Sequence, residues 1–194
     1  MKRIFATGWL LIGLSVFVAG CQSNESKNDG EQKNVVHQPE KSTYVFPLTG
    51  KKTSDQEAVE QRPVAVMVNN DPRARPQSGL HQADLVYEVL AEGAVTRFEA
   101  IFQSERPDRI GPVRSARDYY IELASGYDAL YVAHGWSPEA KDMLQSGTID
   151  HINGMAYDGT LFERVSFRKS PHNSYITFDH ILEGAELNGY DMTA

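Results

Sequence analysis

The densest group of residues able to do chemistry is the segment 109–117, Arg-Ile-Gly-Pro-Val-Arg-Ser-Ala-Arg. Gly111 and Pro112 predict a turn, and Arg114 and Arg117 lie three residues apart where a helix is expected to begin. A helix N-terminus presents free N–H groups and the positive end of its dipole, so it favours an anion. Two guanidinium groups at that end are unfavourable for the helix itself. Their presence therefore predicts a binding site for a phosphate or carboxylate group.

A structural role is the alternative for these arginines. Arg–carboxylate pairs are common in ordinary folds, and Glu88, Glu92 and Glu99 lie in the strands expected just before the motif. The sequence leaves both interpretations open. The candidate ligand-binding arginines in this part of the chain are Arg97, Arg114 and Arg117.

A second polar group lies farther along the chain, in a loop-rich stretch. His172 follows a proline and precedes Asn173, which offers a near-neutral titrating group beside an amide that can orient it. Arg168 adds a cation to the same loop. His134 follows an expected strand end, where α/β folds commonly place site residues. The alternative for each histidine is a structural hydrogen-bonding role, which is the commoner one for a lone histidine. The functional interpretation predicts that these residues join the arginines in one ligand-binding site.

Known catalytic and cofactor motifs are absent from the sequence. It has no HExxH pattern, no Gly-x-Ser-x-Gly elbow, no phosphate-binding Walker loop and no GxGxxG, so we predict neither a metal nor a cofactor. The catalytic residues, if the protein is an enzyme, stay unknown. A phosphotransferase or hydrolase acting on the cell wall is the alternative to binding, and it would need acids such as Asp71, Asp84 and Asp118 gathered beside Arg114 to hold Mg²⁺.

The N-terminus predicts export and lipidation. Lys2 and Arg3 precede the apolar run 4–18, and small residues lead to Cys21, the only cysteine. This is the anatomy of a signal peptide, and the run is too short for a stable transmembrane helix. A cysteine directly after the cleavage point resembles the lipobox of bacterial lipoproteins, so residues 1–20 are expected to be removed and Cys21 to carry acyl chains such as palmitate. The alternative is an ordinary secretory signal with an incidental cysteine.

The charge of the exported chain limits how it can attach to the membrane. Removal of residues 1–20 leaves 17 bases against 26 acids, a formal charge of −9. Such a chain has no long-range attraction to nucleic acid or anionic lipid, so we expect no nucleic-acid partner and a membrane anchor at Cys21 alone. Residues 21–43 are polar and are expected to form a disordered tether. The predicted location is the extracytoplasmic face of the cell membrane, with a cell-wall component or an envelope protein as partner.

Hydrophobic periodicity predicts an α/β fold for residues 44–194, a layered sandwich with a mixed β-sheet flanked by helices. Residues 44–50 form an apolar patch expected to dock as an extended strap. The expected strands are 63–68, 83–91, 94–103 and 128–134, and the expected helices are 115–125, 137–147 and 178–187.

Several motifs, in order, resemble the DUF3048 family. They are 47–50 (PLTG), 62–70 (RPVAVMVNN), 74–80 (ARPQSGL), 83–88 (ADLVYE), 92–93 (EG), 96–98 (TRF), 111–117 (GPVRSAR) and 171–173 (PHN). The resemblance covers residues 44–194 and implies a bacterial cell-surface lipoprotein of uncharacterised activity. It supplies no catalytic residue. Family members generally carry a second, C-terminal domain, so residues 44–194 are expected to be the N-terminal domain of a two-domain protein.

Overall fold

The computed structural model describes residues 43–194, so the predicted signal peptide, Cys21 and tether lie outside the described residues. A five-stranded mixed sheet, in the order β4-β5-β3-β6-β7, forms the centre of the domain. β3 runs antiparallel to β5 and parallel to β6, which is in turn parallel to β7. The strands are β3 (Val64–Asn69), β4 (Leu85–Glu92), β5 (Val95–Phe102), β6 (Leu130–Ala133) and β7 (His151–Asn153).

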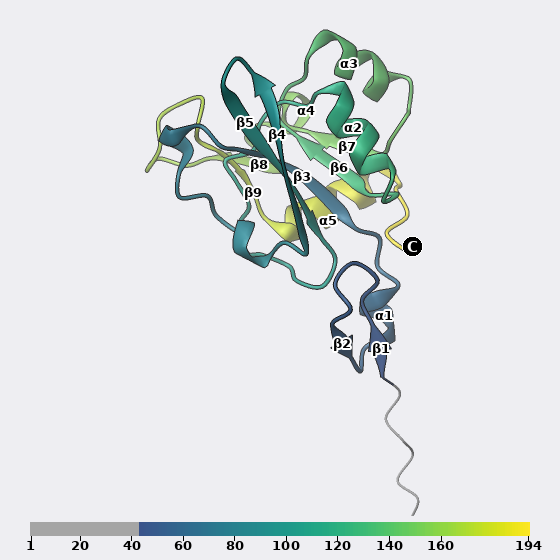
Figure 1. Cartoon of the computed structure of the whole chain (residues 1–194). Helices are drawn as coiled ribbons and strands as arrows, with labels where there is room; N and C mark the ends of the chain where they lie inside the picture. The colour runs from purple at the N-terminus through teal and green to yellow at the C-terminus, as the bar shows by residue number, and fades with distance from the viewer. Residues whose placement is uncertain (1–42) are drawn as a thin grey trace, which may run out of the picture. The chain divides into compact units, whose positions relative to one another are not determined.

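Helices cover both faces of this sheet, which confirms the predicted layered α/β sandwich (Figure 1). On one face α2 (Asp118–Ser125) and α3 (Pro138–Gln145) pack over Met67, Ile101 and Tyr131. On the other face α5 (Phe178–Asn188) packs against β3 and β6. No helix among residues 43–194 has the length and apolar character needed to cross a membrane.

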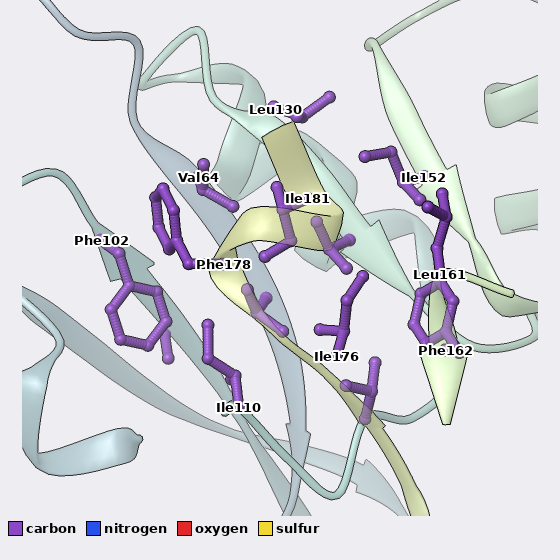
Figure 2. Packing of buried hydrophobic residues seen from close by; sticks show 14 of the residues in the cluster. Val64, Phe102, Ile110, Leu130, Ile152, Leu161, Phe162, Ile176, Phe178 and Ile181 are labelled. Atoms are coloured by element: carbon purple, nitrogen blue, oxygen red, sulfur yellow. The ribbon is translucent and has the colours of Figure 1, made fainter. Parts of the chain in front are cut away.

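The core beneath α5 explains why β3 is a central strand. All six residues of β3 are buried, because its even-numbered side chains face α5 and its odd-numbered side chains face α2. Figure 2 shows Phe178 and Ile181 of α5 beside Val64 of β3 and Ile176. Burying a Phe or Ile side chain of this kind stabilises the fold by about 1.5–3 kcal/mol.

Smaller elements surround the sheet. The predicted strap 44–50 is partly a strand, because β1 pairs with β2 and Phe46 is buried. β8 and β9 form a separate hairpin whose loop spans residues 165–173. The remaining bounds are β1 (Tyr44–Val45), β2 (Lys52–Thr53), α1 (Gln56–Val59), η1 (Pro72–Ala74), η2 (Leu80–Gln82), α4 (Gly154–Tyr157), β8 (Phe162–Arg164) and β9 (Ser174–Ile176).

Two helices begin and end where the sequence predicts. Ser137 caps α3 by accepting a hydrogen bond from the Ala140 N–H. Gly189 closes α5 in the left-handed conformation that glycine adopts most readily. The predicted strands and the hairpin of β4 and β5 are also confirmed. β5 lies between β4 and β3 and is buried on both faces over its second half.

The predicted start of α2 is wrong by three residues. The expected helix 115–125 starts at Ser115, but the observed helix begins at Asp118 and Arg117 occupies the cap position without a side-chain bond. The Ser115 hydroxyl instead donates to the His134 carbonyl at 3.2 Å. The backbone of residues 113–116 is hydrogen-bonded to neighbouring strands and loops, which holds it extended and delays the helix.

Arg62 joins the amino ends of the parallel strands. Its buried guanidinium donates to Asp150 at 2.6 Å and to the backbone carbonyls of Asp128 and Asp191. Asp128 and Asp150 precede β6 and β7, and Arg62 itself precedes β3. One side chain therefore ties three loops at the end of the sheet opposite to the carboxyl ends of β3, β6 and β7.

Glu99 is a fully buried carboxyl in the core under α2. Neither of its oxygens has a hydrogen-bond partner, and the buried Tyr131 hydroxyl in the same cluster has none either. Burial raises the pKa of Glu99 to about 8. The carboxyl is therefore protonated in the folded domain at neutral pH, whereas in the unfolded chain it is ionised.

This difference predicts a pH dependence of stability. Between the unfolded pKa near 4.5 and the folded pKa of about 8, the folded state holds a proton that the unfolded state has lost. The free energy of unfolding should therefore fall as pH rises through this window, by at most about 1.4 kcal/mol per pH unit. Glu99→Gln should remove this slope in urea unfolding measured from pH 5 to 8, and Glu88→Gln on the exposed face of β4 should keep it. Equal slopes for the wild type and Glu99→Gln would contradict the assignment.

Candidate functional site

The carboxyl ends of three parallel strands bring polar side chains together. Asn69 ends β3, His134 follows β6 and Asn153 ends β7. The Asn153 side chain accepts from the Gly135 N–H at 2.9 Å and fixes the turn after β6. Open α/β sheets place ligand sites at this edge, as the sequence predicted for His134.

An extended segment, residues 110–116, crosses this edge and positions Arg114. The Arg114 N–H donates to the Met67 carbonyl of β3 at 2.9 Å, and the Arg114 carbonyl accepts from the His134 N–H at 2.9 Å. The Val113 N–H donates to the Ser174 carbonyl of β9 at 2.7 Å. Arg114 thus lies between β3, β6 and the β8–β9 hairpin, although the sequence placed it at a helix start.

Gly111 lets this segment approach the hairpin. A Cβ at this position would lie 2.7 Å from Cδ1 of the Tyr175 ring and 3.0 Å from the Ser174 carbonyl oxygen. Any side chain at this position would separate the segment from β9. The glycine that the sequence assigned to a turn therefore serves a close backbone approach.

His172 is buried beside Asn69, and the pair has a defined orientation. The Asn69 side-chain oxygen accepts from the Asp71 N–H at 3.0 Å, so its amide nitrogen faces His172 Nδ1 at 2.9 Å. An amide NH₂ only donates, so Nδ1 accepts and the neutral ring carries its proton on Nε2. His172 is 6% exposed and Nε2 has no hydrogen-bond partner. The structure therefore presents a buried N–H donor that is free to bind.

The electrostatic environment keeps His172 neutral. Burial lowers the pKa of His172, and Arg73, Arg114 and Arg168 lower it further against the opposing effect of Asp71. A neutral imidazole at physiological pH can donate from Nε2 without adding a charge.

A pocket of about 360 Å³ lies next to His172. Its lining is Arg73, Phe167, Arg168, Lys169, Ser170 and His172. Phe167 is 62% exposed and stacks against Arg168, whose guanidinium carbon lies 5.9 Å from the ring centre. The lining combines three cations, a neutral donor and an aromatic face, which is the chemistry of an anion-binding pocket.

Two further buried donors lie beside this pocket without hydrogen-bond partners. They are Arg168 Nε and the Tyr175 hydroxyl. Burial raises the pKa of Tyr175, while the Arg168 and Ser78 side chains beside its hydroxyl oppose this rise. The Tyr175 ring packs on Phe167 with 5.6 Å between ring centres. The Tyr175 hydroxyl thus faces Arg168, whereas His172 Nε2 has no such group beside it.

Arg168 also holds the hairpin loop against the loop after β3. Its Nη1 donates to the carbonyl oxygens of Arg73 at 2.9 Å and Arg75 at 3.1 Å, and its Nη2 donates to the Pro76 carbonyl oxygen. Arg73 itself pairs with Asp71 at 2.8 Å, and this pairing lowers the pKa of Asp71. These contacts assemble the positive rim of the pocket from two loops far apart in sequence.

His134 belongs to a neighbouring hydrogen-bonded chain. Arg164 pairs with Asp158 at 2.9 Å and also lies 2.9 Å from His134 Nε2. A guanidinium only donates, so Nε2 accepts and the proton of His134 is on Nδ1, facing the Ser174 hydroxyl at 2.7 Å. Burial and Arg164 lower the pKa of His134. Gly154 makes room for this ring, because a Cβ there would lie 2.1 Å from Nδ1.

Arg97 and Arg117 form ion pairs within the domain, as the structural interpretation of the motif arginines predicts. Both pair with the Glu92 carboxylate, Arg97 at 2.9 Å. Arg97 is 4% exposed and also donates to the Ser115 carbonyl at 2.7 Å. The other predicted site residues lie around the pocket or in the adjacent hydrogen-bond series of His134. They are Arg114, His134, Arg168, His172 and Asn173.

The three acids that a magnesium-dependent reaction would need are not gathered. Asp84 accepts from the backbone of Gln103 and Ser104, and Asp118 lies in the first turn of α2. Asp71 is engaged by Arg73. Within residues 43–194, no three His, Cys, Asp or Glu side chains are grouped so that they could hold a metal ion.

Sequence reasoning missed Asn69 and Arg73. A polar residue at the carboxyl end of a buried strand was the signal for Asn69, since the same argument selected His134. No sequence signal identifies Arg73, because its role depends on the docking of residues 165–173.

Comparisons with known proteins agree with this fold. Residues 48–191 match the family described as "Protein of unknown function (DUF3048) N-terminal domain". A Bacillus subtilis (strain 168) protein named "Putative lipoprotein YerB" is 54% identical over 162 residues, which cover 84% of this chain and 48% of that protein. The crystal structure of YerB protein from Bacillus subtilis is similar with a TM-score of 0.76 and 56% identity, over 77% of this chain and 51% of that chain. The chain thus spans about half the length of the relatives it matches.

The paired and the unpaired arginines predict effects of different size on stability. Arg97→Leu removes two hydrogen bonds of a buried charged group and should lower the free energy of unfolding by about 1–3 kcal/mol. Arg114→Gln removes a cation that has no carboxylate partner among residues 43–194, and it should change stability by less than about 0.5 kcal/mol. Urea unfolding followed by circular dichroism measures both. A loss for Arg114→Gln as large as that for Arg97→Leu would show that Arg114 is structural.

Proposed function

The chain belongs to the DUF3048 family, and on this premise we propose that it is a lipid-anchored lipoprotein of the extracytoplasmic membrane face that binds a phosphate-bearing ligand. The name of the Bacillus subtilis relative supports the lipoprotein assignment. The lipobox-like sequence ending at Cys21 supports an acyl anchor at that residue. The partner would be a cell-wall component or an envelope protein.

The buried Nε2–H of His172 is the observation that supports ligand binding. Asn69 fixes the direction of this donor, and no protein group accepts from it. A buried polar group without a partner costs about 1–3 kcal/mol, so a fold retains one where something else completes it. Cations around it favour an anion as that group.

The number of donors favours phosphate over carboxylate. His172 Nε2 and Arg168 Nε come from one hairpin, and the Lys169 ammonium and the Ser170 side chain line the same pocket. Phosphate offers three acceptor oxygens around a tetrahedral centre, whereas carboxylate offers two in a plane. Lys169 and Arg73 add charge at the rim of the pocket.

A binding role is preferred to a phosphotransferase or hydrolase role. Such catalysis would use acids beside Arg114 to hold Mg²⁺, and Asp84 and Asp118 have other contacts and other places in the fold. His172 is neutral and orients a donor, which suits binding without a reaction step.

Phosphate binding tests the pocket. Inorganic phosphate titrated into the detergent-solubilised full chain should bind with a dissociation constant of about 1 mM, measured by calorimetry. His172→Gln removes the oriented donor and should weaken binding by about tenfold or more. His81→Gln, at an exposed histidine of η2, is the matched control and should bind as the wild type does. Absence of phosphate binding, or unchanged affinity in His172→Gln, would overturn the proposed pocket.

Membrane fractionation tests the anchor. Cys21→Ala removes the only acylation site and should move the protein from the membrane fraction to the soluble fraction, because the acidic chain has no electrostatic attraction to anionic lipid. Ser26→Ala, in the same polar stretch, should stay in the membrane fraction. Membrane retention of Cys21→Ala would show that a protein partner holds the chain there.

A further inference from the structure

Arg114 is a half-buried cation that lacks an acid partner. Its guanidinium makes one hydrogen bond, from Nη1 to the Pro171 carbonyl at 3.3 Å, and forms no ion pair among residues 43–194. Two other predicted site arginines, Arg97 and Arg117, share Glu92. Arg114 therefore differs from its neighbours in having most of its N–H donors unused.

The surroundings of Arg114 are themselves positive. Arg97, Arg164 and Arg73 repel it, and the one attracting acid, Asp71, is already bound by Arg73 through both carboxylate oxygens. Burial and this repulsion lower the pKa of Arg114. Partial burial of an uncompensated charge is costly, so an anion from outside the described residues would stabilise this arrangement.

The position of Arg114 places it next to the pocket and outside its lining. Its contact, Pro171, directly precedes His172. On the other side is Arg164, whose charge acts on Arg114, and both arginines act on the neutral His134. The positive groups thus follow one another from the pocket through Arg114 toward Arg164. We call this series the basic strip: Arg73, Arg168, Lys169, Arg114 and Arg164.

We infer that Arg114 is a second anion subsite and that the ligand is a linear chain carrying successive phosphate groups, one in the His172 pocket and the next on Arg114. This inference rests on the proposed function, since it assigns a ligand class to the same site. The chain as a whole carries a formal charge of −7, so general attraction to polyanions does not account for such binding. A local strip of guanidinium groups does, because Arg binds successive phosphates through paired N–H donors.

A series of phosphates of increasing length tests this subsite. Orthophosphate, pyrophosphate and tripolyphosphate are titrated by calorimetry into the detergent-solubilised full chain at one fixed salt concentration. The second contact should make tripolyphosphate bind about tenfold or more tightly than orthophosphate in the wild type. Arg114→Gln should leave orthophosphate affinity within about twofold and remove the gain with length.

Arg109→Gln is the matched control. Arg109 lies in the same motif and carries the same charge, but it pairs with Glu163 at 2.7 Å. Its substitution changes the net charge equally and should keep the gain with length. If Arg109→Gln reduced the gain in affinity with chain length as much as Arg114→Gln does, the gain would be due to overall charge. That result would overturn the inference.

The remaining outcomes separate the inference from the proposed function. Orthophosphate binding that depends on His172, without a gain for tripolyphosphate, would overturn the second subsite and leave the pocket in place. A gain that depends on Arg114 but not on His172 would support the subsite and overturn the pocket. Poly-glutamate of equal charge binding as tightly as tripolyphosphate would overturn the assignment to a chain of phosphate groups.

Discussion

The extended path of residues 110–116 is the constraint on which the site depends. Its backbone bonds to Met67 of β3, to Ser174 of β9 and to the turn at His134 hold three parts of the chain at one edge of the sheet. These bonds satisfy backbone groups that would otherwise be buried without partners, so the segment cannot become the first turn of α2. The same path places Arg114 between the two histidines and brings the β8–β9 hairpin over the end of β3.

The two histidines show how neighbouring side chains assign different roles to one residue type. Asn69 donates to Nδ1 of His172 and leaves its buried Nε2–H without an acceptor in the protein. Arg164 donates to Nε2 of His134 and turns its Nδ1–H inward to Ser174. One ring therefore offers a donor for a ligand, while the other bridges Arg164 of β8 and Ser174 of β9. Both are neutral for the same reason, burial among guanidinium groups.

The arginines divide in a similar way, and the division depends on the acids within reach. Glu92 extends from the β4–β5 hairpin and forms ion pairs with both Arg97 and Arg117. These pairs connect the hairpin to the start of α2. Arg114 lies apart from Glu92, near Asp71 and Asp158. Asp71 is already paired with Arg73, and Asp158 with Arg164. An acidic protein thus carries a local positive strip, because its nearby acids are already engaged or point elsewhere.

The sequence alone determined the α/β class, the order of the main strands and helices, and the caps of α3 and α5, since these follow from local periodicity and from Ser137 and Gly189. It also selected His134, His172 and the motif arginines as polar residues in suggestive places. Only the tertiary structure decided which arginines are paired, which histidine nitrogen carries the proton, and that Asn69 and Arg73 join the site. The physical reason is that these properties depend on contacts between β3, the segment 110–116 and the β8–β9 hairpin, which are separated by dozens of residues along the chain and meet only when the sheet is formed.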